Sequence, residues 1–139
     1  MITKIDPKLE WLRPYLDDAK TWLNLDSLKR IYLFHASLRR ERRVDGLVRP
    51  IKGNSFELGL YLQYTHAGKL SNFSTINVLE IFAHELGHLH LMSIDPDDDQ
   101  HTIPHKQLEL NIMKEFLDIL ENEGYTTEEE EEKLFKILK

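Results

Sequence analysis

Apolar and polar residues alternate in one stretch of the chain, residues 55–64, in the pattern of a β-strand. In its sequence, SFELGLYLQY, every second residue is apolar and faces the same side. Residues 28–38 are rich in β-branched and aromatic residues and are also typical of a strand. The strand 55–64 is expected to pair with residues 46–51 through a turn at 52–54. This pairing places Pro50 at the edge of the sheet or at the end of its strand.

Two other stretches, one near the N-terminus and one in the middle of the chain, show helical spacing instead. In residues 6–23 leucine or, at position 19, alanine recurs every three or four positions after Asp6, a residue suited to the N-cap. Pro14 interrupts this pattern and predicts a kink or two short helices. A second helix is expected from about residue 75 to 92, with Ser74 or the following threonine as its cap.

The last third of the chain predicts two more helices. One is expected over residues 104–123, where a proline suits the start and a glycine follows the end, and the other begins after Thr127. Together these elements predict a single α+β domain over residues 1–139. We expect a small antiparallel or mixed sheet packed on two central helices, with further helices at the N- and C-terminal ends.

The composition limits which chemistry the domain can carry. The chain has 139 residues and no cysteine, which excludes a disulfide framework and thiolate metal sites. Any metal would therefore bind to His, Asp or Glu. The first residues contain no apolar core of a signal peptide, and no apolar run is long enough to cross a bilayer. We expect a cytoplasmic protein that does not enter membranes.

Charge is unevenly distributed along the chain. Residues 1–70 contain 13 Lys and Arg against 8 Asp and Glu, whereas residues 71–139 contain 5 against 16. An acidic chain, with a net charge of −6, is a poor general binder of nucleic acid. The strip 39–52, with six basic and two acidic residues, is the place where DNA could bind. A solvated hairpin is favoured there because few aromatic residues are interleaved.

His84, Glu85 and His88 form the pattern His-Glu-x-x-His within the sequence FAHELGHLHLM. On a helix, residues four apart project side by side, so the two imidazoles can share one tetrahedral zinc ion. Glu85 is rotated by about 100° from His84 and can act as general base on a zinc-bound water. The alternative is a pair of structural histidines with ordinary hydrogen bonds.

The surroundings of this motif favour the metal site. The preceding residues 76–83 are mostly apolar, which indicates a buried helix, and two buried histidines need polar partners. The helix also contains Gly87, which costs about 1 kcal/mol relative to alanine. A helix tolerates this cost where another group must approach its backbone closely.

A catalytic zinc ion usually has three protein ligands and one open position. Glu109 lies in the middle of an otherwise apolar face of the next predicted helix, where a carboxylate requires a cation or a proton. We therefore predict that Glu109 is the third ligand. An Arg or Lys across the core is the alternative partner for Glu109. The alternative third ligands are Glu115, His101 and His105.

With these residues in place, the chain resembles zinc metallopeptidases of the gluzincin type, in a minimal form. The sequences HELGHLH and LELN look most like those of small immunity-repressor-cleaving peptidases associated with phages and mobile elements. The resemblance covers about residues 55–120. It implies a zincin-like fold, a bound Zn²⁺ ion and hydrolysis of a peptide or protein substrate. It also implies roles for four residues: Glu85 as general base, and His84, His88 and Glu109 as zinc ligands.

The resemblance carries two more implications. In zincins the strand before the active-site helix is an edge along the cleft, so the resemblance implies that residues 55–64 pair with extended substrate. The alternative is that residues 55–64 form a central core strand. A His or Tyr is expected to stabilise the oxyanion; the candidates are Tyr61, Tyr64, Tyr125, His101 and His105. Two alternative functions stay open: a zincin-like binding domain without turnover, and a DNA-associated SprT-like protease that binds DNA through residues 39–52.

Overall fold

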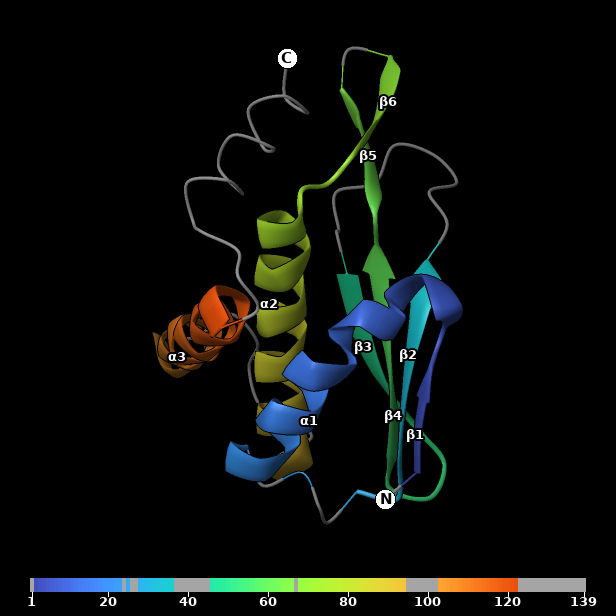
Figure 1. Ribbon diagram of the computed structural model, residues 1–139. Coiled ribbons are helices and arrows are strands. Elements are labelled where there is room, and N and C mark those ends of the chain that lie inside the picture. Colours follow the sequence, from blue (N-terminus) through green and yellow to red (C-terminus); the bar gives the residue numbers. More distant parts are fainter. Residues whose placement is uncertain are drawn as a thin grey trace.

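The computed structural model consists of a mixed β-sheet with helices packed on one of its faces (Figure 1). The protein has an α+β fold with three α-helices and a short 3-10 helix among the residues that the structure describes. These residues are 2–23, 25, 28–36, 46–66, 68–94 and 103–122.

Four strands form the main sheet in the order β1-β2-β4-β3. Their bounds are Ile2–Ile5 for β1, Arg30–Ala36 for β2, Gly46–Ile51 for β3 and Ser55–Tyr61 for β4. Strands β1 and β4 run parallel to β2, and β3 runs antiparallel to β4. The predicted pairing of residues 46–51 with the next strand is thus confirmed. Pro50 lies on the edge strand, as expected for a residue without an N–H group.

The strand predicted over residues 55–64 differs from the expectation in two ways. First, β4 ends at Tyr61, and the chain continues into a separate hairpin formed by β5 (Gln63–His66) and β6 (Lys69–Asn72). Second, β4 lies between β2 and β3 and β3 is the strand at the edge, so the alternative of a central core strand is the one observed. The edge position was implied by the resemblance alone, because the alternation identifies the faces of a strand and carries no information about its neighbours.

The N-terminal helical region is divided in two, as Pro14 predicted. A 3-10 helix, η1 (Pro7–Leu12), is followed directly by α1 (Arg13–Trp22). The Asp6 carboxylate accepts a hydrogen bond from the backbone N–H of Lys8 at 3.1 Å and caps η1. Pro14 falls in the first turn of α1, where a missing N–H group has no helical partner to lose.

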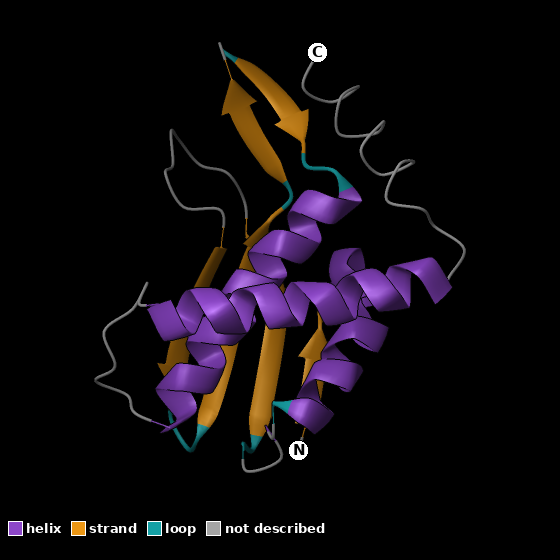
Figure 2. Ribbon diagram, turned by 90° about the vertical axis from the view of Figure 1, so that its left-hand side faces the viewer, coloured by secondary structure: helices purple, strands orange, loops and turns teal. Residues whose placement is uncertain are grey.

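The two central helices are α2 (Thr75–Ile94) and α3 (Ile103–Asn122). Helix α2 lies against the sheet, and α3 crosses over α2 and α1 on the side away from it (Figure 2). Of the helices in the described ranges, none combines the length and apolar character needed to cross a membrane. The last predicted helix, after Thr127, lies outside the described residues.

The core fills the space between the sheet and the helices. Phe116 of α3 stacks on Phe82 of α2, with ring centroids 5.6 Å apart, and meets the edge of the Tyr15 ring of α1 at 5.4 Å. All three rings are buried. These contacts join the three helices, and they thereby fix the position of α3 over the middle of α2.

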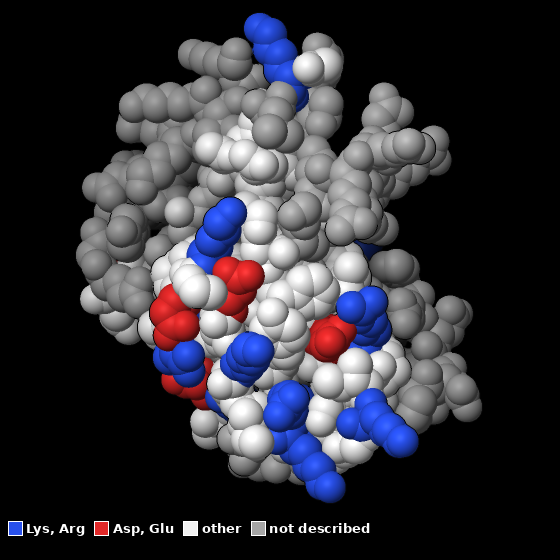
Figure 3. Space-filling view, turned by 90° about the vertical axis from the view of Figure 1, so that its right-hand side faces the viewer, with Lys and Arg blue, Asp and Glu red and all other residues white. Residues whose placement is uncertain are grey.

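The other face of the sheet carries several Lys and Arg side chains (Figure 3), and two of them lie over aromatic rings. The rings of Tyr32 and Phe34 stack on each other, with Lys4 over the first ring and Arg49 over the second. Of the basic strip 39–52, residues 46–52 form β3 and the beginning of the turn that follows. Residues 39–45 lie outside the described ranges.

The cap of α2 provides a first testable prediction. The Ser74 hydroxyl accepts a hydrogen bond from the backbone N–H of Asn77 at 3.2 Å, which confirms the predicted cap. Ser74→Ala is expected to lower the free energy of unfolding by about 1 kcal/mol, because this N–H group loses its partner. Urea denaturation measures the loss. Ser74→Asp preserves an acceptor and should restore most of it; an equal loss in both variants would contradict the capping role.

Candidate metal centre

His84 and His88 project from consecutive turns of α2, as their spacing predicted. Their Nε2 atoms lie 3.0 Å apart, and their ring planes meet at 87°. Two nitrogens that bind one tetrahedral zinc ion at about 2.0–2.1 Å lie about 3.3 Å apart. The observed separation is therefore close to the one that a shared ion requires.

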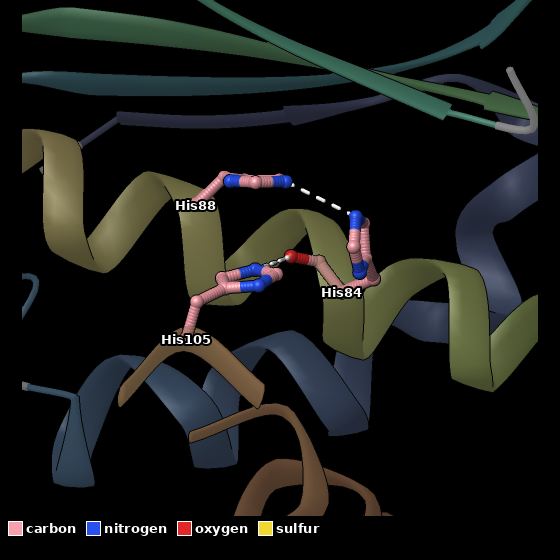
Figure 4. Close-up of side chains that lie close together, drawn as sticks. All are labelled: His84, His88 and His105. Atoms are coloured by element: carbon pink, nitrogen blue, oxygen red, sulfur yellow. Dashed lines mark hydrogen bonds between the residues drawn. The ribbon is translucent and has the colours of Figure 1, made fainter. Parts of the chain in front are cut away.

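His105 reaches the same place from the first turn of α3 (Figure 4). Its ring is buried and stacks on the ring of His88, with centroids 4.0 Å apart and planes at 17°. Its Nε2 atom lies 3.0 Å from the backbone carbonyl oxygen of His84. One ring nitrogen from each of the three histidines lies within 4.8 Å of the others, a cluster that could hold a metal ion.

Gly87 provides the space in which His105 lies. A Cβ atom at position 87 would be 3.0 Å from both Cδ2 and Nε2 of His105. Real Cβ contacts are rarely so short. The glycine was expected to admit a group close to the helix backbone, and that group is the imidazole of His105.

Glu109 also lies at the site, but it contacts the opposite side of His84. Its Oε2 atom is 3.0 Å from Nδ1 of His84, and the side chains of Glu109 and His84 are 29% and 30% exposed. The Arg or Lys considered as an alternative partner is thus replaced by a histidine. Glu109 is only half-buried, because α3 crosses α2 and only part of the apolar face of α3 is covered. The sequence pattern identifies this face but does not show which part of it is covered. Its role as a ligand stays a prediction.

A second carboxylate lies near Glu109. Partial desolvation of Glu80, and then repulsion from the Glu109 carboxylate, raise the pKa of the Glu80 carboxyl above its usual range. Glu80 precedes His84 by one helical turn. Two acidic groups beside the histidines make the electrostatic potential there favourable for a cation.

Glu85 is buried next to the edge strand, with 6% of its surface exposed. A Cβ atom at Gly46, the first residue of β3, would be 2.9 Å from Cγ of Glu85 and 3.0 Å from Cγ2 of Ile81. The missing side chain at position 46 therefore makes room for Glu85. Sequence reasoning did not identify Gly46; the only signal was a glycine at the start of a predicted strand.

The remaining candidates are distributed around or beyond this cluster. Glu115 is exposed on α3 and does not belong to the histidine cluster. Tyr61 is buried in β4. His101 and Tyr125 lie outside the described residues, as does the side chain of Tyr64.

Gly46→Ala tests the close approach of β3 to α2. The added methyl group is expected to lower the free energy of unfolding by about 1–3 kcal/mol, because Glu85 and Ile81 must move. Chemical denaturation measures the loss. In a Glu85→Ala background the same substitution should cost less, since the contact with Glu85 is gone and only the contact with Ile81 is left of the two. Equal costs in both backgrounds would show that Glu85 is not the group that Gly46 accommodates.

No protein-family model matches the chain, and neither a curated protein nor a solved structure is significantly similar to it. The chemistry of the side chains described above is therefore the basis for a functional assignment.

Proposed function

We propose that the protein is a zinc-dependent peptidase with a zincin-like arrangement, in which His84 and His88 bind the ion and Glu85 is the general base. The observation that carries this proposal is the pair of Nε2 atoms 3.0 Å apart on α2, with the buried Glu85 in the same turn. A helix with two metal-binding nitrogens and an adjacent carboxylate contains the minimum needed for metal-assisted hydrolysis.

The donor atoms suit a zinc ion. Imidazole nitrogens and carboxylate oxygens are ordinary zinc ligands. Besides the two histidines of α2, helix α3 supplies one imidazole, His105, and one carboxylate, Glu109. Two Nε2 atoms that face each other require either a proton or a cation between them. The nearby carboxylates of Glu80 and Glu109 favour the cation.

The proposed reaction is the hydrolysis of a peptide bond. Zinc, when bound, supplies Lewis acidity: it polarises the scissile carbonyl and lowers the pKa of water. Glu85 accepts a proton from the attacking water and delivers it to the leaving amine, so the products are a carboxylate and a free amine. The side chain is held for this task between α2 and β3, where Gly46 leaves room for it.

The edge position of β3 favours a peptide as the substrate. In the described part of the sheet, β3 has β4 on one side and no strand on the other, and its first residue lies against Glu85. Unpaired backbone groups of an edge strand can bind an extended peptide by main-chain hydrogen bonds. The substrate-binding strand proposed here is therefore β3, in place of the strand 55–64.

The proposal is tested by metal content and turnover measured on the same purified chain. Mass spectrometry of the wild type should give about one zinc ion per chain, and His88→Ala should lose it. A peptide library should be hydrolysed, with activity removed by a chelator and restored by zinc. His90→Ala is the matched control, because His90 contacts the backbone oxygen of Leu23 and lies outside the cluster.

Two outcomes would contradict the proposal in different ways. A chain that binds no zinc even after reconstitution would show that the histidines are structural. A chain that binds zinc and hydrolyses no library member would favour the alternative, a zinc-containing binding domain without turnover.

A further inference from the structure

Two side chains of α3 that could bind a metal, His105 and Glu109, lie one turn apart and contact the same residue of α2. The His105 ring contacts the backbone oxygen of His84, and the Glu109 carboxylate contacts Nδ1 of the His84 ring. Both donors cannot have the same role, because they approach different parts of His84. The hydrogen-bonding capacity of each atom distinguishes the two roles.

The His84 ring separates Glu109 from the place where an ion would lie. An ionised carboxylate only accepts hydrogen bonds, so Nδ1 of His84 donates to Glu109 and Nε2 carries the lone pair. That Nε2 atom faces Nε2 of His88. The two nitrogens of an imidazole point in different directions. An ion bound to Nε2 therefore lies on the side of the ring away from Glu109.

The hydrogen bond of His105 assigns its nitrogens as well. A backbone carbonyl oxygen only accepts, so Nε2 of His105 donates to it and, in the neutral ring, Nδ1 carries the lone pair. Histidines that bind metals usually donate their other ring N–H to a carbonyl or a carboxylate, which fixes the ring. His105 and His84 both have this arrangement.

Packing holds the His105 ring in this position. The ring is 1% exposed and occupies the space left by Gly87. We infer that His105 is the third metal ligand, through Nδ1, and that Glu109 is a positioning residue that holds His84 through Nδ1. This inference rests on the proposed zinc site, and it replaces the predicted ligand Glu109 by one of the alternatives. Three neutral imidazoles leave a fourth position on the ion open.

Zinc affinity in two variants distinguishes the two ligand sets. Glu109→Gln preserves an acceptor for the His84 N–H, so if Glu109 only positions His84, zinc affinity should fall by no more than about 10- to 100-fold. If Glu109 were a ligand, the loss would be larger, because a glutamine side chain is a poor zinc ligand. His105→Ala removes a ligand, so its zinc affinity should fall much further. Competition with a chromophoric chelator measures both affinities, with His90→Ala as the control that should match the wild type.

X-ray absorption of the zinc-loaded wild type provides a readout that does not depend on activity. Three imidazoles per ion are expected, and two in His105→Ala. Gly87→Ala keeps every donor but pushes His105 away, so it should also lose affinity, although alanine favours a helix more than glycine does.

Other results would overturn the inference. Tight binding in His105→Ala with loss in Glu109→Gln, or a spectrum with two imidazoles and a carboxylate, would make Glu109 the ligand and leave the proposed peptidase intact. A three-imidazole spectrum without peptide hydrolysis would support the inference and contradict the peptidase. A wild type that binds no zinc would overturn both.

Discussion

Glu85→Gln is expected to leave zinc bound and to lower peptide hydrolysis by about 10²- to 10⁴-fold. Glutamine has nearly the same shape as glutamate, so it fits between α2 and β3, where Glu85 is buried beside Gly46. It cannot accept a proton at neutral pH, and the attacking water therefore loses its base. The kcat for a library-derived peptide and the zinc content of the same sample measure the two effects.

A matched control separates this effect from a general loss of charge. Glu115 is exposed on α3, and Glu115→Gln should leave kcat unchanged. Hydrolysis at the wild-type rate in Glu85→Gln would refute the general-base role. Loss of zinc in that variant would mean that Glu85 helps to hold the metal site together and that its activity cannot be interpreted as chemistry alone.

Phe116→Ala is expected to lower the free energy of unfolding by about 3–5 kcal/mol. The ring is fully buried between Phe82 and Tyr15, and its removal leaves a cavity where the three helices meet. This loss is a large fraction of the stability of a typical domain. Urea denaturation measures it, preferably on the metal-free protein, so that zinc binding does not offset the loss.

The control for this prediction lies on the same helix. Leu110 is 70% exposed, so Leu110→Ala should change the free energy of unfolding by less than about 0.5 kcal/mol. Similar losses in the two variants would show that α3 is not packed against the core as described. Because Phe116 fixes α3 over α2, the destabilised variant should also bind zinc less tightly.

Local features of the fold were predictable from the sequence. The two-part N-terminal helix follows from Pro14, and the start of α2 follows from Ser74, because both residues act on their immediate neighbours. The pairing of β3 with β4 follows from the short turn between them. The central position of β4 was not predictable. It depends on β2, whose partner strands are chosen by the packing of the whole sheet.

In the candidate site, too, the local features were predictable from the sequence and the long-range ones were not. The adjacency of His84 and His88 is set within one helix and could be predicted from their spacing. The helical repeat also places His105 and Glu109 on one face of α3. Which of them meets which nitrogen depends on how α3 crosses α2, and this angle is set by side chains such as Phe116. Gly46 was missed because its neighbour Glu85 is distant in the sequence.

Within the described residues β3 has no strand on its outer side, and this edge has a consequence for association between molecules of the protein. An edge that accepts a substrate strand can also accept the edge of another copy, which is a route to aggregation. The second half of β3 carries features that oppose this: the charged side chain of Arg49 and the ring of Pro50, which has no N–H to donate. The first half of the strand, beside Glu85, is thus better suited to strand addition than the second half.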